Sequence, residues 1–125
     1  MIHLLYKEEV YQIAGICMDV YNILGHGFME VVYKDAMELE FIENELEYLR
    51  EQEFPIIYKG RKLKRTFFAD FVLFDKIIVE VKANTDGITE EAIAQTLNYL
   101  KASGNRIGLV INFGKHRLEY KRVIF

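Results

Sequence analysis

The stretch that decides the fold runs from Leu63 to Ala83 and reads LKRTFFADFVLFDKIIVEVKA. Apolar side chains occupy odd positions on both sides of a short turn: Phe67, Ala69, Phe71, Leu73, Ile77, Val79, Val81 and Ala83. A period of two is typical of β-strands, so the stretch predicts an antiparallel hairpin with one apolar face. The even residues then share the opposite face. In one register of this hairpin, Asp70 lies directly opposite Glu80.

Two helices are predicted upstream of the hairpin. Apolar residues spaced three and four apart predict an amphipathic helix over about residues 6–24. Gly25 and Gly27 end it, because glycine allows the backbone conformations that terminate helices. A second stripe with the same spacing predicts a helix over about residues 29–50.

The remaining elements are a strand, a helix and two strands, over about residues 54–58, 90–103, 107–113 and 118–125. Pro55 lacks a backbone N–H, which places its strand at a sheet edge or at the start of a strand. Thr89 is the expected N-cap of the helix, and Gly104 its exit. The order α-α-β-β-β-α-β-β predicts an α/β fold in which helices flank a mixed β-sheet.

Length and composition narrow the class of protein. The chain has 125 residues, 51% of them hydrophobic, so we expect one domain over residues 1–125 with its own core. This composition excludes intrinsic disorder, and the apolar runs are too short for a membrane span. The N-terminus lacks the pattern of a secretory signal, and we expect a cytoplasmic location. A single cysteine, Cys17, cannot form an internal disulfide and is expected in the core.

The charge pattern bears on nucleic acid as a partner. The formal net charge of −3 argues against a field around the whole protein, so a polyanion would need a local basic patch. Two segments are basic, residues 59–65 and 115–122, whereas residues 38–53 are rich in glutamate. Such runs are most often solvated faces. Two basic segments beside one site would be stronger evidence for binding of nucleic acid.

The hairpin also contains the residues that could perform chemistry. Two carboxylates opposed across a strand pair repel each other, and burial penalises each of them. Lys82, on the same face as Glu80, is one possible counter-charge for Asp70 and Glu80. A divalent cation is another, because Mg²⁺ binds carboxylate oxygens. An ion-paired or solvent-exposed sheet edge without chemistry remains the alternative.

Five motifs in order along the chain resemble a known family. They are Gly27-x-x-Glu30-x-x-Tyr33, Ala69-Asp70, Glu80-Val81-Lys82, Gln95 with Asn98-Tyr99-Leu100-Lys101, and Ile111-Asn112-Phe113-Gly114. In this order and spacing, the chain resembles the GxxExxY protein family, a compact branch of the PD-(D/E)xK nuclease superfamily. Two positions depart from the usual pattern, because Ala69 and His26 stand where proline is common.

The resemblance implies a restriction-endonuclease-like core and a metal-dependent nuclease. Asp70, Glu80 and the helical Glu30 would bind Mg²⁺ or Mn²⁺, Lys82 would act on the attacking water or on developing charge, and Gln95 would lie beside the site. Neighbouring carboxylates favour a charged lysine, so we place electrostatic stabilisation above general base catalysis. The expected partner is nucleic acid, DNA or RNA, with a homodimer or larger assembly to hold it. The alternative is a non-catalytic nucleic-acid-binding or accessory module that keeps this fold.

Other polar residues invite simpler interpretations. Tyr33 could hydrogen-bond Glu30 or the backbone, or pack half-buried, and Asn112 is expected to serve a turn. The three histidines, His3, His26 and His116, are scattered in the sequence and are expected on the surface or in loops.

Overall fold

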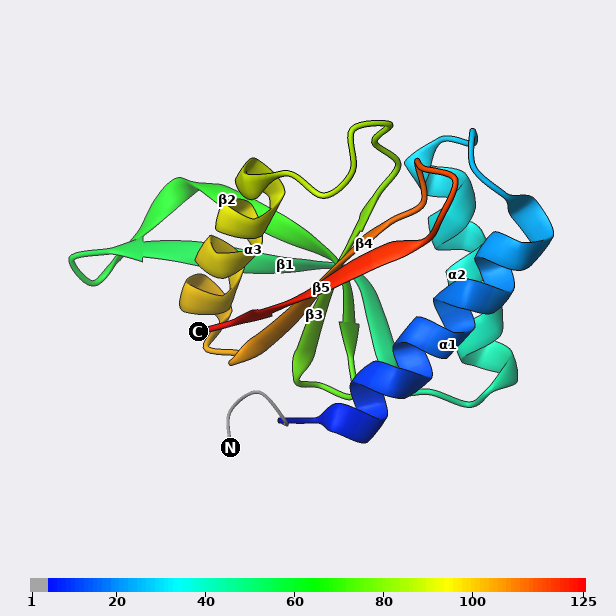
Figure 1. Cartoon of the computed structure of the whole chain (residues 1–125). Helices are drawn as coiled ribbons and strands as arrows, with labels where there is room; N and C mark the ends of the chain where they lie inside the picture. The colour runs from blue at the N-terminus through cyan, green and yellow to red at the C-terminus, as the bar shows by residue number, and fades with distance from the viewer. Residues whose placement is uncertain (1–4) are drawn as a thin grey trace.

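Eight elements follow one another in the predicted order α-α-β-β-β-α-β-β within residues 5–125, the part of the chain that the computed structural model describes (Figure 1). They are α1 (Lys7–Leu24), α2 (Glu30–Glu43), β1 (Tyr48–Tyr58), β2 (Arg61–Leu73), β3 (Ile77–Lys82), α3 (Glu90–Ser103), β4 (Ile107–Asn112) and β5 (Glu119–Ile124). The predicted α/β class with a mixed sheet is confirmed.

A five-stranded sheet in the order β1-β2-β3-β4-β5 forms the middle of the fold. β3 and β4 run parallel because α3 carries the chain back between them, whereas the other neighbouring strands are antiparallel. β3 and β4 are buried along their length apart from Lys82, as expected for parallel strands with helices on both faces. The side chains near the ends of β3 and β4 therefore lie at the centre of the sheet, where the strands are buried.

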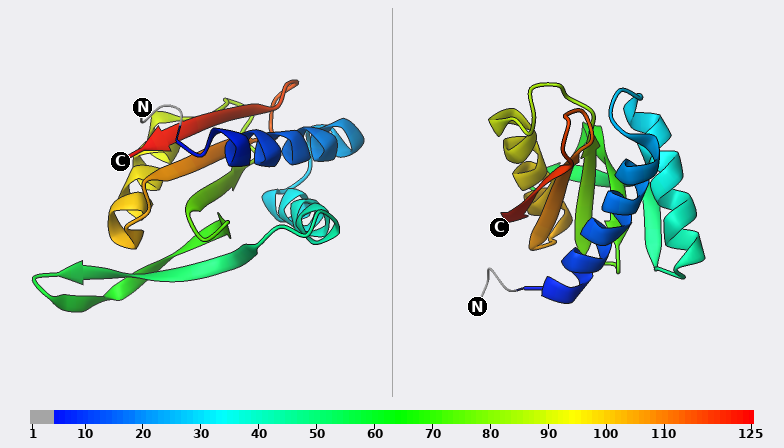
Figure 2. Two further views of the ribbon diagram at one scale, coloured as in Figure 1. Left: turned by 90° about the horizontal axis from the view of Figure 1, so that it is seen from below. Right: turned by 45° about the vertical axis from the view of Figure 1, so that its right-hand side comes forward.

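Two apolar cores hold the helices against the sheet. α1 and α2 cover one face, where Ile13, Met37 and Phe41 are buried together with strand residues. α3 covers the opposite face, where Leu100 packs in the second core (Figure 2). Cys17 is fully buried in the first core, as its place in the apolar stripe predicted.

α3 begins and ends at the predicted residues. Thr89 Oγ1 accepts a hydrogen bond from Ala92 N–H at 3.1 Å, which satisfies one of the free N–H groups at the helix start. Gly104 ends the helix with a φ of 79°, a left-handed conformation that glycine adopts without steric cost.

α2 ends at Glu43, and the prediction of a helix as far as residue 50 is wrong. Tyr48, Leu49 and Arg50 instead pair with residues 71–73 of β2. The apolar spacing in this segment fits a helix, but the segment pairs with β2, and this pairing packs Tyr48 against the first core. Local propensity is overridden in this way whenever tertiary pairing is available.

The β2–β3 hairpin has the register that was considered from the sequence: Phe71 pairs with Val79, and the next position of this register sets Asp70 opposite Glu80. β1 lies at the sheet edge, as Pro55 predicted, although it is longer than expected. The β1–β2 pairing shifts between Pro55 and Ile57, next to the residue that lacks a backbone N–H.

The predicted single apolar face is wrong for the first half of β2. Two of its odd residues pack in the core beneath α3: Phe67 and Ala69. Phe71 packs beneath α1 and α2, so the switch falls at Asp70, opposite Glu51, whose φ of 55° interrupts the extended backbone of β1. The β1–β2 register is the same on both sides of this point, so the two strands turn together. Their outer part, residues 52–69, is called the β1–β2 arm and extends past α3 (Figures 1 and 2).

Candidate functional site

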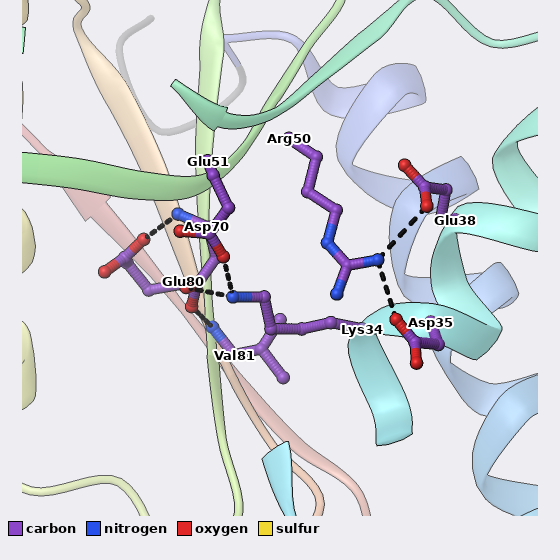
Figure 3. A network of polar contacts seen from close by, with 8 residues as sticks. All are labelled: Lys34, Asp35, Glu38, Arg50, Glu51, Asp70, Glu80 and Val81. Carbon is purple, nitrogen blue, oxygen red and sulfur yellow. Dashed lines mark hydrogen bonds and ion pairs between the residues drawn. The ribbon is translucent and has the colours of Figure 1, made fainter. Parts of the chain in front are cut away.

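The candidate site begins where the backbone pairing of β2 and β3 ends. At the position after Phe71 and Val79, each strand offers a carboxylate to the backbone of the other (Figure 3). Glu80 Oε2 accepts a hydrogen bond from Asp70 N–H at 2.8 Å, and Asp70 Oδ2 accepts one from Val81 N–H at 2.7 Å. The two carboxylates are therefore held next to each other by the strands themselves, and Glu80 is only 4% exposed.

This arrangement changes the protonation of Glu80. Burial, and then the nearby charge of Asp70, raise the pKa of Glu80 to about 8. The hydrogen bond from Asp70 N–H and the charges of Lys82 and Lys34 oppose the rise without cancelling it. Near neutral pH, the pair therefore carries a proton or calls for an added cation.

A lysine from α2 provides one positive charge. Lys34 Nζ lies 2.9 Å from Asp70 Oδ1 and also pairs with Glu51 on β1. Burial alone would lower the pKa of Lys34, but its hydrogen bonds to Glu51 and Asp70 raise that pKa above its ordinary value, so the ammonium stays charged. Arg50 of β1 makes a second ion pair between β1 and α2, because its guanidinium lies 2.8 Å from the carboxylate of Asp35.

Sequence analysis missed both Lys34 and Glu51. Lys34 follows the Gly-x-x-Glu-x-x-Tyr motif directly, but nothing in its spacing relates it to Asp70, from which it is separated by 36 positions. The contact depends on how α2 packs against the sheet. From the sequence, Lys82 was one possible counter-charge of the pair and a divalent cation the other, whereas the ion pairs within residues 5–125 join Asp70 to Lys34.

Replacement of Lys34 tests this pairing. We expect Lys34→Gln to lower the free energy of unfolding by about 2 kcal/mol, because it leaves the partly buried carboxylate of Asp70 without its cationic partner. The same variant should bind Mn²⁺ roughly tenfold more tightly, since Asp70 Oδ1 is freed from an ammonium. Urea unfolding and calorimetry measure the two effects, with Lys121→Gln on exposed β5 as the matched control. Weaker Mn²⁺ binding in Lys34→Gln would contradict this role.

The fold brings Lys82 and Gln95 together. Lys82 is the last residue of β3, Gln95 stands on α3, and Lys82 Nζ lies 3.5 Å from Gln95 Oε1, a long contact. Both side chains line a cleft of about 310 Å³. The charge of Lys82 also acts on Glu80. The cleft therefore places a cation and an amide beside the acidic pair.

Glu30 is not joined to this group. It is the exposed first residue of α2, and none of the hydrogen bonds or ion pairs found in residues 5–125 links it to Asp70 or Glu80. Across that same range, no three or more His, Cys, Asp or Glu side chains converge in a way that could hold a metal ion. The third acid of the predicted set thus stays apart from the other two.

Tyr33 fastens the loop that precedes Glu30. Its hydroxyl donates to the Gly25 carbonyl at 2.6 Å and accepts from Phe28 N–H at 3.2 Å, while its ring is buried against Phe113 at 4.3 Å between centroids. Of the interpretations left open from the sequence, hydrogen bonding to the backbone is confirmed, and the packed ring is fully buried instead of half-buried. This tyrosine determines where α2 starts, and so where Glu30 stands.

Asn112 joins the ends of the two parallel strands. Its Oδ1 accepts from Asn84 N–H at 2.8 Å, and its Nδ2 donates to the Asn84 carbonyl at 3.0 Å. Gly114 leaves room for this contact, because a Cβ there would lie 2.3 Å from the Asn84 carbonyl oxygen. Asn112 thus does more than serve its own turn: it holds the segment that follows Lys82.

The basic segments lie at two separate places. Residues 59–65 form the exposed tip of the β1–β2 arm. In the other segment, His116 meets His26 with ring centroids 4.5 Å apart, and the Tyr21 hydroxyl donates to the Lys115 carbonyl. The fold therefore brings together two histidines that are far apart in the sequence, whereas His3 lies outside the described residues.

The residues of the acidic pair fit a divalent cation. Asp70 and Glu80 are hard oxygen donors, and Glu80 Oε1 accepts no hydrogen bond from residues 5–125. Burial, and then the charge of Asp70, raise the pKa of Glu80, so a cation bound beside the pair would stabilise the ionised form of Glu80. Mg²⁺ is commonly held by one or two carboxylates and keeps several waters, so two donors are sufficient.

Comparison with known proteins identifies the family and the fold. The sequence matches the family model of the PD-(D/E)XK nuclease superfamily over residues 7–123. The crystal structure of SSO0001 is similar, with a TM-score of 0.59 and 17% sequence identity over 74% of this chain. The similar part amounts to 48% of that protein, so this chain spans about half of its length, and the likeness concerns the fold alone. No curated protein matches the sequence.

Within the described residues, none of the helices is long and apolar enough to cross a membrane.

Proposed function

The chain belongs to the PD-(D/E)XK nuclease superfamily, and on that premise we propose that it is a metal-dependent nuclease that hydrolyses phosphodiester bonds in nucleic acid. The observation that carries this proposal is the Asp70–Glu80 pair, in which Glu80 is buried and Asp70 half-buried, with Lys82 beside it. Superfamily membership supports a nucleic acid substrate, and the excess negative charge of the pair supports a divalent metal. We further place the chain in the GxxExxY branch, on Gly27, Glu30 and Tyr33, and take residues 1–125 as one nuclease domain.

Each site residue has a proposed role. Asp70 and Glu80 would hold Mg²⁺ or Mn²⁺, which when bound polarises a phosphate oxygen and lowers the pKa of a water molecule. Lys82 would stabilise the negative charge that develops on the phosphate. Gln95 would orient that ammonium. Glu30, exposed and apart from the pair, would act through water.

A second candidate function has an observation in its favour. Lys34 already compensates Asp70, and Glu30 is not joined to the pair, so the fold supplies a counter-charge without a metal. A non-catalytic nucleic-acid-binding or accessory module would show these features. In either case we propose a homodimer or larger assembly, since so small a chain offers little surface for holding a substrate. A cytoplasmic location stays a prediction from the N-terminal sequence.

Metal titration tests the proposed function and separates it from the second candidate. We expect saturable binding of Mn²⁺ and Mg²⁺ to the wild type in calorimetry, and loss of that binding in Glu80→Ala, because one of two oxygen donors is removed. Glu43→Ala, at the exposed end of α2, is the matched control and should bind normally. Absence of binding to the wild type, with or without oligonucleotide, would favour the non-catalytic module.

A further inference from the structure

A groove of about 670 Å³ lies between the β1–β2 arm and α3, outside the acidic pair. Its walls include Ile57 and Phe67 of the arm and Asn98, Tyr99 and Ala102 of α3. The volume is in the range of small-molecule sites, roughly 300–1,000 Å³. The β1–β2 arm passes beside α3 (Figure 1), and Phe67 of the arm stacks on Tyr99 of that helix.

The lining combines aromatic rings with amides. Phe67 and Tyr99 stack in parallel with centroids 4.0 Å apart, and Phe54 stacks on the same Phe67 at 5.2 Å. The amides of Gln95 and Asn98 stand in the same wall. Aromatic faces bind bases by stacking, and Asn and Gln amides match the hydrogen-bonding edges of bases.

The charge around the groove suits a polyanion. Lys101 lines it, and none of its lining residues is acidic. The arm carries five basic residues at its exposed tip: Lys59, Arg61, Lys62, Lys64 and Arg65. These cations would contact phosphates on the far side of a base seated in the groove, in the manner of basic tracks that follow single strands.

The groove is continuous with the candidate site. Gln95 lines the groove and also contacts Lys82, which stands beside Glu80. The pKa of Tyr99 is raised by burial and by the charges of Glu80 and Asp70, so the aromatic wall lies within electrostatic reach of the acidic pair. A base in the groove would therefore leave its own phosphate close to Lys82.

We propose that this groove binds an unpaired base of single-stranded nucleic acid, next to the phosphodiester that meets Lys82. This inference rests on the proposed function and names its substrate class. A base inside a duplex is stacked and paired, and so cannot enter the groove unless it leaves the helix. Single strands, or strands with unpaired positions, are thus the expected ligands.

Tyr99→Trp reports directly on the groove. The chain contains no tryptophan, so this variant has one fluorophore, placed on the aromatic wall. We expect single-stranded oligonucleotides to quench it, and to bind roughly tenfold more tightly than an abasic strand of the same length and charge. Tyr11→Trp on α1, where the native side chain is 69% exposed, is the control and should not be quenched. Equal affinity for normal and abasic strands would overturn the proposal.

A second variant fills the groove. Ala102→Trp adds a large side chain at an exposed lining position of α3, and Ala94→Trp adds the same group to an exposed position of that helix that does not line the groove. We expect Ala102→Trp to weaken single-strand binding about tenfold or more and Ala94→Trp to leave it unchanged, with Mn²⁺ binding intact in both.

The outcomes separate this inference from the proposed function. If the wild type binds Mn²⁺ and cleaves, and Ala102→Trp binds single strands as well as the wild type does, the proposed base binding in the groove would be overturned. The proposed nuclease function would be unaffected. If the wild type neither binds metal nor cleaves, but Ala102→Trp binds single strands more weakly than the wild type, the groove would be supported and the nuclease function overturned. Loss of a wild-type dimer in Ala102→Trp by sedimentation, with strand affinity unchanged, would assign the groove to a second copy and overturn the inference.

Discussion

Lys82→Ala should lose cleavage by at least about a hundredfold while it keeps its metal affinity. The expected loss follows from removing a fixed positive charge next to the phosphate, an effect that typically amounts to 10²–10³-fold, roughly 3–4 kcal/mol of barrier. Metal affinity should persist because Lys82 donates no ligand and Asp70 and Glu80 remain in place. Initial rates on labelled DNA and RNA, single-stranded and duplex, with Mn²⁺ calorimetry on the same samples, measure both quantities.

The control for this experiment is Lys121→Ala, which removes an equally flexible cation from exposed β5. Its rates should stay within a few-fold of the wild type. Gln95→Ala is a graded comparison, because its carbonyl oxygen touches Lys82 at 3.5 Å and a smaller loss is expected. Cleavage by Lys82→Ala at the wild-type rate would remove Lys82 from the mechanism.

Glu80→Gln should make the metal-free protein more stable at alkaline pH and nearly unchanged at acid pH. The pKa of Glu80 is about 8 in the fold against 4.5 ordinarily, because of burial and the charge of Asp70. Between these values the folded state holds a proton that the unfolded chain has lost. The contribution of Glu80 is therefore fully present below about pH 4.5 and is lost as pH rises through about 8.

The size of the effect follows from linkage. In that interval, stability falls by up to about 1.4 kcal/mol per pH unit in the wild type. The glutamine side chain of the variant does not titrate and can still accept from Asp70 N–H, so the variant should exceed the wild type by up to about 5 kcal/mol at pH 8.5. Urea unfolding from pH 4.5 to 8.5 without metal measures this difference. A difference that stays constant across that range would show that Glu80 is ionised throughout.

Metal binding provides a second measurement of the proton on Glu80. A cation held by Asp70 and Glu80 requires both carboxylates to be charged, so binding at pH 7 should release a proton. Calorimetry in two buffers of different ionisation enthalpy detects that release. With saturating Mg²⁺, the fall in stability toward alkaline pH should flatten, because the added cation compensates the charge on Glu80.

The acidic pair was predictable because it depends on one hairpin. Alternating apolar residues and a short turn determine which residues of β2 and β3 face each other, and the side chains of Asp70 and Glu80 follow from that register. The limits of α3 were predictable for a similar reason. Thr89 and Gly104 act on the backbone within a few residues of themselves.

Other features depend on segments that are distant in the sequence. Residues 48–50 have helical spacing, and pairing with β2 made them a strand. Likewise, the alternation of β2 was correct, but the turn opposite Glu51 moved Phe67 to the core beneath α3. The alternation of apolar residues predicts which residues lie on the same side of a strand, but it does not predict where a pair of strands bends.

The sequence by itself determined the order of the elements, the β2–β3 register and the two carboxylates that this register opposes. The tertiary structure decided what surrounds them: Lys34 as the cation on Asp70, Glu30 apart from the pair, and the groove between the arm and α3. The physical reason is the range of the interactions. Hydrogen bonds of a tight hairpin join near neighbours in the sequence, whereas a counter-ion or a groove wall is supplied by whichever distant element the core packs alongside.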